Sequence, residues 1–312
     1  KPNYGKIKKH LNQVLKKPLL HLKKVKVLIY QQEYNFMTLK ILKSYTKSTR
    51  GTVLVDRKKL WKGKSLKSLT LGKSSTGGRN NLGRITSRSK GAGHKQKYRE
   101  IDFYRKKDNL EAKIERIEYD PNRSAYVALI KYEDGVMNYI LAPNKIKIGD
   151  EIVSGRNKKI EIGNCMQLSD IPTGTDIHNI ELLPNGGGKL VRSAGSSAQI
   201  SGMDDNYCIV KLNSGEIKNV NENCFATVGT VSNLDNKNIK IGSAGRKRWL
   251  GFRPKVRCVA MNPIDHPHGG GEGKSSGGRN PVSPWGQSAK GLKTRNNTRT
   301  NKYIISRRKK RV

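Results

Sequence analysis

The chain has 312 residues, a formal net charge of +39, and only 34% hydrophobic and 6% aromatic residues. The charge is segregated: residues 1–100 carry 27 basic against 3 acidic side chains, residues 236–312 carry 20 against 2, and residues 101–235 carry 16 against 19. Neither a membrane nor a small-molecule site needs that much charge, whereas a phosphate backbone does, so we expect a near-neutral globular body between two polyanion-binding extensions.

Residues 1–36 are rich in Lys and contain one acidic residue, Glu33. Ile7, Leu11 and Val14 recur at helical spacing before Pro18 ends the pattern. One interpretation is a basic amphipathic targeting helix. Transit peptides favour Arg and Ser, however, and this stretch has neither. A lineage-specific extension that contacts RNA is therefore the favoured interpretation.

Residues 37–97 form a second basic segment with two glycine-rich stretches, Gly72–Arg84 and Gly91–Lys97. Glycine allows two backbones to approach closely, and the intervening Lys, Arg and His side chains supply charge. A disordered linker is the alternative, but a linker rarely needs this density of basic residues. We expect an RNA-binding arm that is ordered by its partner.

Residues 98–164 favour β-strands over Ala112–Tyr119, Tyr126–Tyr132 and Val136–Leu141, and Lys145–Val153 predicts a further strand pair around a Gly-Asp turn. The tripeptide Glu-Asp-Gly between the second and third of these strands is a hairpin signal. Because short strands separated by glycine turns are typical of small barrels, we expect the first of two barrels here.

Residues 165–235 repeat the pattern over Asn179–Leu183, Tyr207–Leu212, Glu216–Val220 and Ala226–Val231. They predict a second barrel, each barrel having about five strands. The fold class is therefore all-β.

The four cysteines are Cys165, Cys208, Cys224 and Cys258, and no pair has the C-x-x-C spacing of a zinc ribbon. Three of them lie in or beside apolar runs, which indicates reduced, buried thiols. No apolar run approaches the ~20 residues of a membrane span.

Residues 236–312 lose the strand pattern and become rich in Gly, Pro, Ser and Arg, with Trp249 and Phe252 among the basic residues. They predict a second RNA-binding extension, which ends in the basic run Arg307-Arg-Lys-Lys-Arg311.

The segment Met261–Ser275 permits three chemical interpretations. A phosphate-binding P-loop would need glycine where His268 stands, with a strand before it and a helix after it. A metal site could use His266, His268 and Asp265, but a further ligand is not evident. A general base would lack a nucleophile or an oxyanion donor. A rigid, proline-punctuated loop that contacts RNA fits the context better than any of them.

The same segment carries a family resemblance. Residues 261–286 closely resemble large-ribosomal-subunit protein two, the universal "L two" family. Further matching blocks follow the family order: Ser75–Arg84, Gly91–Lys97, Glu118–Ala125, Tyr139–Pro143, Arg192–Gly195 and Gly251–Arg257. The resemblance covers about residues 38–311.

This resemblance implies an OB-like barrel followed by an SH3-like barrel, and basic extensions that penetrate large-subunit ribosomal RNA near the peptidyl-transferase centre. It also implies roles in subunit assembly, subunit association and tRNA placement, with other ribosomal proteins and the small subunit as neighbours and one copy per ribosome. A histidine of the loop, His266 or His268, has been suspected of a role in peptide-bond formation. Because that chemistry is generally assigned to RNA, we expect no enzymatic activity, and the failed P-loop pattern and the missing metal ligands lead us to expect no cofactor and no metal.

Residues 274–279 look more like members from the bacterial lineage that gave rise to mitochondria than like plastid members. Together with the frequent Lys, Asn and Ile and the N-terminal extension, this favours a mitochondrial ribosome over a plastid one.

The candidate RNA-binding residues are mainly arginines of the arms, since guanidinium groups bind phosphate bidentately and stack on bases, with histidine and tryptophan as stacking groups. Packing within the protein is an equal alternative for Trp249. The candidates are Arg79, Arg84, Arg88, His94, Lys95, Arg99, Arg123, Arg192, Arg246, Arg248, Trp249, Arg253, Arg257, His266, His268, Lys274, Arg279, Trp285, Arg295, Arg299, Arg307 and Arg308.

Two other classes of protein share parts of this pattern. A chromatin-like DNA-binding protein would share the charge, but it needs a groove-reading helix that these Gly- and Pro-rich regions do not predict. A nucleotide-dependent RNA remodeller would depend only on Gly273-Lys274-Ser275.

Overall fold

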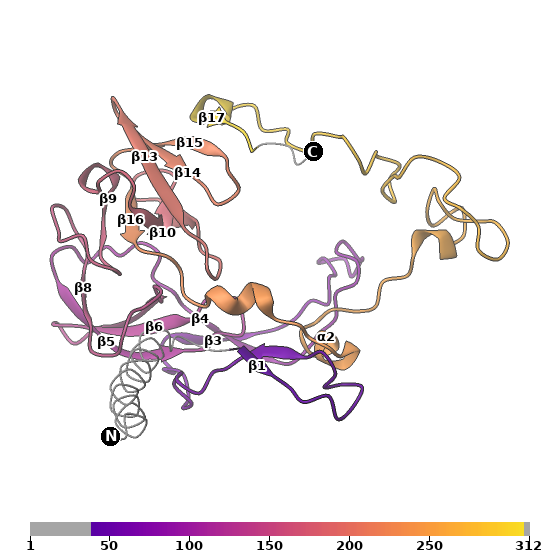
Figure 1. Ribbon diagram of the computed structural model, residues 1–312, viewed down its shortest axis with the longest axis horizontal. Helices are drawn as coiled ribbons and strands as arrows, with labels where there is room; N and C mark the ends of the chain where they lie inside the picture. Colours follow the sequence, from indigo (N-terminus) through magenta and orange to yellow (C-terminus); the bar gives the residue numbers. More distant parts are fainter. Residues whose placement is uncertain (1–38, 309–312) are drawn as a thin grey trace, which may run out of the picture.

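The computed structural model describes residues 39–308, which form an all-β protein with two large sheets, three two-stranded ones and long extensions (Figure 1). The strands are β1 (Leu39–Ile41), β2 (Val53–Val55), β3 (Thr70–Lys73), β4 (Gln96–Arg99), β5 (Glu111–Glu118), β6 (Val127–Tyr132), β7 (Met137–Leu141), β8 (Glu151–Val153), β9 (Cys165–Gln167), β10 (Asp176–His178), β11 (Ile180–Glu181), β12 (Gly188–Leu190), β13 (Ala198–Asp204), β14 (Tyr207–Lys211), β15 (Ile217–Asn221), β16 (Phe225–Val228) and β17 (Ile304–Ser306). The helices are α2 (Ala244–Trp249) and the short 3₁₀ helices η1 (Leu168–Asp170), η2 (Leu234–Asn238), η3 (Cys258–Ala260) and η4 (Asn301–Tyr303).

The first sheet is antiparallel and has the strand order β7-β6-β5-β8, at the place predicted for the first barrel. Alternate side chains of β5 are buried, because successive residues of a strand point to opposite faces. Its core includes Ile114, Ile130, Ile140 and Ile152. The predicted hairpin between β6 and β7 is confirmed, with Gly135 at φ +81° in its turn.

The strand pair predicted over Lys145–Val153 is wrong in its first half. Only β8 is a strand, and residues 145–150 form turns in which the Asp150 carboxylate accepts a hydrogen bond from the Lys147 N–H at 2.7 Å. A side chain that accepts a hydrogen bond from a nearby backbone N–H competes with strand pairing, so the strand begins only at Glu151.

The second sheet has the order β17-β15-β14-β13-β10-β16-β9. Its core packs Met166, Ile177, Ile200, Val210 and Val220. Strands β9, β10, β13 and β17 of this sheet were not predicted, nor was β12, which pairs with β11 in a separate two-stranded sheet. The predicted Tyr207–Leu212 and Glu216–Val220 correspond to β14 and β15, which pair as a hairpin.

A small contact joins the two sheets. Val231 packs with Ala125 and Leu141 of the first sheet, and it forms a bridge to Pro143. The hydroxyl of Ser232 accepts a hydrogen bond from the Tyr126 N–H at 3.1 Å. The segment that follows β16 is therefore held against the first sheet.

A histidine is buried inside the second sheet. His178 is 1% exposed, its Nδ1 hydrogen bonds to the Gly229 carbonyl at 2.8 Å, and its Nε2 has no partner in the described chain. Burial lowers the pKa of His178 to about 4, because desolvation disfavours the charged imidazolium. The barrel interior therefore holds this ring neutral.

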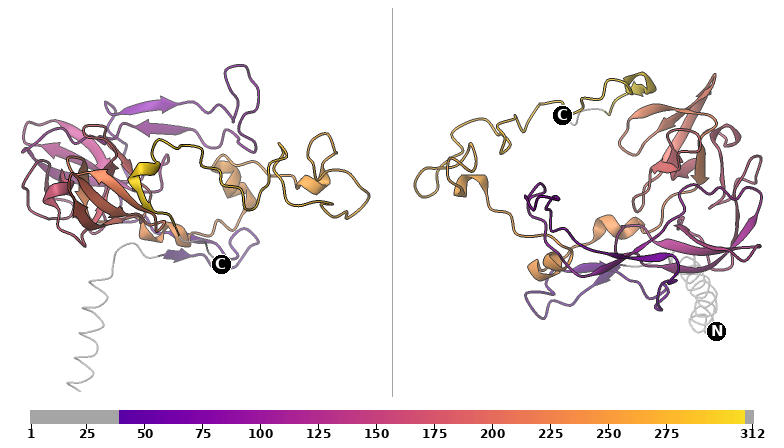
Figure 2. Two further views of the ribbon diagram at one scale, coloured as in Figure 1. Left: turned by 90° about the horizontal axis from the view of Figure 1, so that it is seen from above. Right: turned by 180° about the vertical axis from the view of Figure 1, so that it is seen from behind.

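The extensions are more structured than an irregular arm. The first contains the hairpin β1–β2 and the pair β3–β4. The second leaves the sheets through α2, runs outward and returns, so that β17 pairs with β15 at the edge of the second sheet (Figures 1 and 2). The second extension thus begins beside the first sheet, where Lys240 pairs with Val53 of β2, and ends on the edge of the second.

Cys165, Cys208 and Cys224 are buried and free, as predicted, whereas Cys258 is half-buried. Burial raises the pKa of Cys208 to about 11 and that of Cys224 to about 12, since the interior disfavours a thiolate. In residues 39–308 no helix is long and apolar enough to cross a membrane. The helix predicted within residues 1–36 lies outside the described residues.

Candidate nucleic-acid interface

The two basic arms meet through their backbones. The Gly91 N–H donates to the Gly251 carbonyl at 2.8 Å, the His94 N–H to the Trp249 carbonyl at 2.9 Å, and the Arg253 N–H to the Ser89 carbonyl at 3.0 Å. We call residues 89–94 and 249–253 the arm junction. It places basic residues from both ends of the chain side by side.

Glycine is required at the centre of the arm junction. Gly93 has φ +66°, and a Cβ built there would lie 2.8 Å from both the Gly251 nitrogen and the Trp249 carbonyl oxygen. These are backbone atoms, which cannot move as a flexible side chain does. The glycines of this stretch are therefore needed for close contact between the two arms, in addition to spacing the basic side chains.

The arms also make a side-chain contact beside the arm junction. The Arg88 guanidinium lies 5.7 Å from the centre of the Trp285 ring, which is 75% exposed. An exposed indole beside an arginine is a stacking surface for an unpaired base.

The histidine loop, residues 261–282, is organised by its own backbone. The His266 and Asp265 N–H groups donate to the Asn262 carbonyl, and the Gly270 N–H donates to the Met261 carbonyl at 2.9 Å. A Cβ on Gly269 would lie 2.3 Å from the Asn262 oxygen, so this turn also requires glycine.

Two buried imidazoles cross-link the histidine loop. His268 Nδ1 bonds to the Gly277 carbonyl at 2.8 Å, while its Nε2 accepts from the Val282 N–H at 3.0 Å. His266 Nδ1 accepts from the His268 N–H at 3.0 Å, and the two rings stack with centroids 5.3 Å apart. A carbonyl on one side and an N–H on the other require a neutral His268 ring with its proton on Nδ1. Both of its nitrogens are therefore engaged with the main chain.

Arg99 lies inside the protein rather than on its surface. It is 9% exposed, its Nε is 3.1 Å from a Glu118 carboxylate oxygen, and its Nη1 is 3.7 Å from Asp120. Arg116 also pairs with Glu118 at 2.8 Å. This cluster neutralises Arg99 and fastens β4 to β5, so its charge is used internally.

Arg192 stacks on an aromatic ring between the two sheets. Its guanidinium carbon lies 3.7 Å from the centre of Phe103, and its Nε is buried without a partner in the described chain. Arg123 approaches the same ring at 5.9 Å but is paired with Asp120. Desolvation and the neighbouring Arg123 lower the pKa of Arg192, so an anion at this point would be stabilised.

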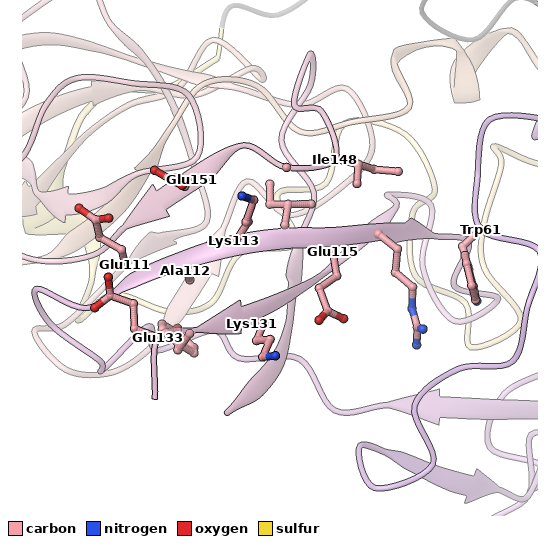
Figure 3. A pocket seen from close by; sticks show the side chains of 13 residues that line it. Trp61, Glu111, Ala112, Lys113, Glu115, Lys131, Glu133, Ile148 and Glu151 are labelled. Carbon is pink, nitrogen blue, oxygen red and sulfur yellow. The ribbon is translucent and has the colours of Figure 1, made fainter. Parts of the chain in front are cut away.

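A cleft on the outer face of the first sheet has a different character. It has a volume of about 720 Å³, and its charged lining residues are Lys113, Arg116, Lys131 and four glutamates, which Figure 3 shows: Glu111, Glu115, Glu133 and Glu151. The acidic side chains slightly outnumber the basic ones here, so this face is less suited to a nucleic acid than the basic arms are.

Most of the predicted binding residues are exposed on the arms. These are Arg79, Arg84, Arg88, His94, Lys95, Arg248, Trp249, Arg253, Arg257, Lys274, Arg279, Trp285, Arg295, Arg299, Arg307 and Arg308. Arg123, Arg192 and Arg246 are half-buried, whereas Arg99, His266 and His268 are buried. Sequence reasoning missed Trp61 and Phe103. Trp61 stands between Lys-Lys-Leu and Lys-Gly-Lys, an aromatic residue in a basic run that could have marked it.

The P-loop and metal interpretations find no support in the described chain. No helix follows Lys274 before η4, and residues 39–308 contain no group of three or more His, Cys, Asp or Glu side chains that could hold a metal ion.

These features define a class of protein: a two-sheet β-scaffold that carries joined basic arms for a polyanion. Comparison with known proteins names the family. Residues 66–154 match the family model "Ribosomal Proteins L2, RNA binding N-terminal domain", and residues 161–286 match "Ribosomal Proteins L2, C-terminal domain". The chain belongs to the ribosomal protein L2 family.

Individual relatives match nearly their full length. The chain is 60% identical to large ribosomal subunit protein uL2 of Pelagibacter ubique, over 88% of this chain and 98% of that protein. It is 61% identical to uL2 of Granulibacter bethesdensis, over 88% and 99%, and 58% identical to uL2 of Rickettsia felis, over 88% and 100%. The family resemblance read from the sequence is thereby confirmed.

Proposed function

We propose that this protein is a structural constituent of the large ribosomal subunit, which binds large-subunit ribosomal RNA with its two arms. The arm junction carries this proposal, because it gathers exposed cations and aromatic rings from both ends of the chain while the sheets keep a balanced charge. Membership of the ribosomal protein L2 family supports the proposal. Other ribosomal proteins are its neighbours, and one copy serves each ribosome.

The exposed candidates of the arms are proposed as the RNA contacts, with Arg123 and Arg192 at the junction of the sheets. Arg99 is proposed as a structural residue instead, because Glu118 and Asp120 neutralise it.

The histidine loop is proposed to hold RNA near the peptidyl-transferase centre and thereby to support assembly, contact with the small subunit and tRNA placement. The engagement of both His268 nitrogens with the main chain supports a positional role rather than acid–base chemistry. The protein thus acts by binding and not as an enzyme.

A mitochondrial ribosome is the proposed location. The relatives are mostly from alphaproteobacteria, the lineage to which mitochondria trace, and the Lys, Asn and Ile content fits an AT-rich organellar genome.

Sucrose-gradient sedimentation of a tagged copy from organelle lysate tests the proposal. We expect co-migration with the large subunit through a high-salt wash, and loss of that co-migration after ribonuclease treatment. Migration at the top of the gradient would contradict a core ribosomal role. Recovery only from the cytosol or the plastid would contradict the location.

Two further measurements separate the rival classes. Equal affinity for duplex DNA and ribosomal RNA at moderate salt would favour a chromatin-like protein. Saturable ATP or GTP binding that is lost in Lys274→Ala would favour a nucleotide-dependent remodeller. We expect neither result.

A further inference from the structure

A cleft of about 480 Å³ opens between strand β4, the end of β5 and the end of α2, a size within the range of ligand sites. Two tryptophans line it from distant parts of the chain, Trp61 and Trp249. They are 49% and 66% exposed. Large aromatic side chains left open to solvent on the same cleft indicate a surface that a partner covers.

Trp61 is held firmly on one wall. Its backbone N–H donates to the Ile117 carbonyl at 2.9 Å, and its indole N–H donates to the Lys64 carbonyl at 3.4 Å. Arg116 lies 4.8 Å from the ring centre. The neighbouring cleft with the four glutamates, the glutamate cleft, is lined by both Arg116 and Trp61, and Figure 3 shows Trp61 at its edge. The cleft between the two tryptophans is lined by Trp61 but not by Arg116. Arg116 thus covers the ring on one side only.

Trp249 is held in the cleft by the arm junction. It is the last residue of α2, and its carbonyl accepts the His94 N–H at 2.9 Å. His94 itself lines the cleft. The two indoles therefore face the same space only while the arms are joined.

The cleft carries unpaired positive charge. Lys95 and Lys97 line it, are exposed, and form no ion pair among the described residues. Glu118 also lines it but is neutralised by Arg99 and Arg116. Aromatic faces with adjacent free cations are the chemistry that recognises a nucleotide.

We propose that this cleft binds one unpaired nucleotide of RNA, with its base against Trp61 and Trp249 and its phosphate on Lys95 and Lys97. A paired base is stacked between its neighbours and cannot present its face to an indole, so the ligand is a base turned out of a loop, bulge or end. This inference rests on the proposed RNA-binding function and names the element that the cleft recognises.

Tryptophan fluorescence of the full chain tests the proposal. The sequence has three tryptophans, so Trp285→Phe leaves only Trp61 and Trp249 as reporters. The probes are a single-stranded RNA of about seven adenosines and an abasic ribose-phosphate chain of equal length and charge. We expect the adenosine probe to quench the fluorescence and to bind about fivefold to a hundredfold more tightly than the abasic probe, the range of one stacked base.

Matched variants locate the effect. Trp61→Ala or Trp249→Ala should remove the preference for the adenosine probe, whereas Trp61→Phe, which keeps an aromatic face, should retain most of it. Lys95→Gln should weaken both probes alike, and Lys113→Gln, on the glutamate cleft, should change neither.

The outcomes separate this proposal from the function on which it rests. Equal binding of both probes, unaffected by Trp61→Ala, would overturn the nucleotide cleft and leave RNA binding intact. If neither the probes nor ribosomal RNA bound the folded chain, the proposed function itself would fail.

Discussion

Replacing Gly93 by Ala should open the arm junction, and Gly83→Ala is its matched control. Both glycines lie in the first arm at positive φ, +66° and +74°. A Cβ at position 93 would meet the backbone of Gly251 and Trp249 at 2.8–2.9 Å, whereas a Cβ at position 83 would meet nothing within 4 Å. The two substitutions therefore share the conformational cost and differ only in the clash.

The magnitude follows from these contacts. An Ala in the left-handed region costs roughly 1–2 kcal/mol at either site. At position 93 the clash also breaks the hydrogen bonds that His94 and Gly91 donate across the junction, each contributing about 0.5–1.5 kcal/mol. The junction should lose about 2–5 kcal/mol, a change of roughly 30-fold or more in its opening equilibrium.

Amide hydrogen exchange of the full chain measures this opening. The amides of His94 and Arg253 should exchange roughly 30-fold or more faster in Gly93→Ala than in the unsubstituted chain, and at nearly the unsubstituted rate in Gly83→Ala. Equal exchange rates at these amides in all three proteins would refute the reasoning, because the junction would then not depend on close backbone approach.

Three further predictions concern single side chains. Folding stability should fall by about 3 kcal/mol as pH drops from above 6.5 to below 4. In this range His178 is protonated in the unfolded chain but stays neutral in the folded protein, where its pKa is about 4. Urea titrations should show a smaller loss of stability over the same pH range in His178→Gln. Arg99→Met should lower stability by roughly 1–3 kcal/mol, because Glu118 and Asp120 each lose one of their two basic partners, but it should leave the salt dependence of RNA affinity unchanged. Lys97→Gln should instead leave stability nearly unchanged and reduce the slope of log affinity against log salt by about 0.7–0.9. In His268→Ala the Val282 amide should exchange with solvent about 10- to 100-fold faster, because it loses its acceptor. The pH dependence of ribosome activity should stay unchanged, and loss of a titrating step near neutral pH would assign the ring a chemical role.

Short-range patterns predicted the first sheet better than the second, in which β9, β10, β13 and β17 were missed. The Glu133-Asp134-Gly135 turn and the strands beside it depend on neighbours in sequence, and the structure confirms them. Strand β17 pairs instead with β15, from which it is separated by the whole second extension, and its three residues are too few to show a period. Pairing at such a distance leaves no local signal.

The candidate site was predicted through charge, which identifies the arms but not the environment of each residue. Arg99 lies in the same basic run as Lys95 and Lys97, yet its side chain points inward because it forms ion pairs with Glu118 and Asp120. Trp61 was missed because a count of charged residues does not show which aromatic side chains line a cleft. Tertiary partners decide both cases.

Charge also explains why the arms are joined by backbone hydrogen bonds and cation–ring contacts rather than by ion pairs. Residues 1–100 and 236–312 are both strongly basic, so their side chains repel and offer few carboxylates for ion pairs. Glycines remove the side chains where the arms touch and leave N–H and C=O groups to pair, as at Gly91 and Gly251. Added salt screens the repulsion and should favour the junction, whereas it weakens RNA binding through counterion release. Added salt should therefore stabilise the arm junction in the free protein and weaken the complex once RNA is bound. In that complex the phosphates of the RNA neutralise the two basic segments, as salt does in the free protein.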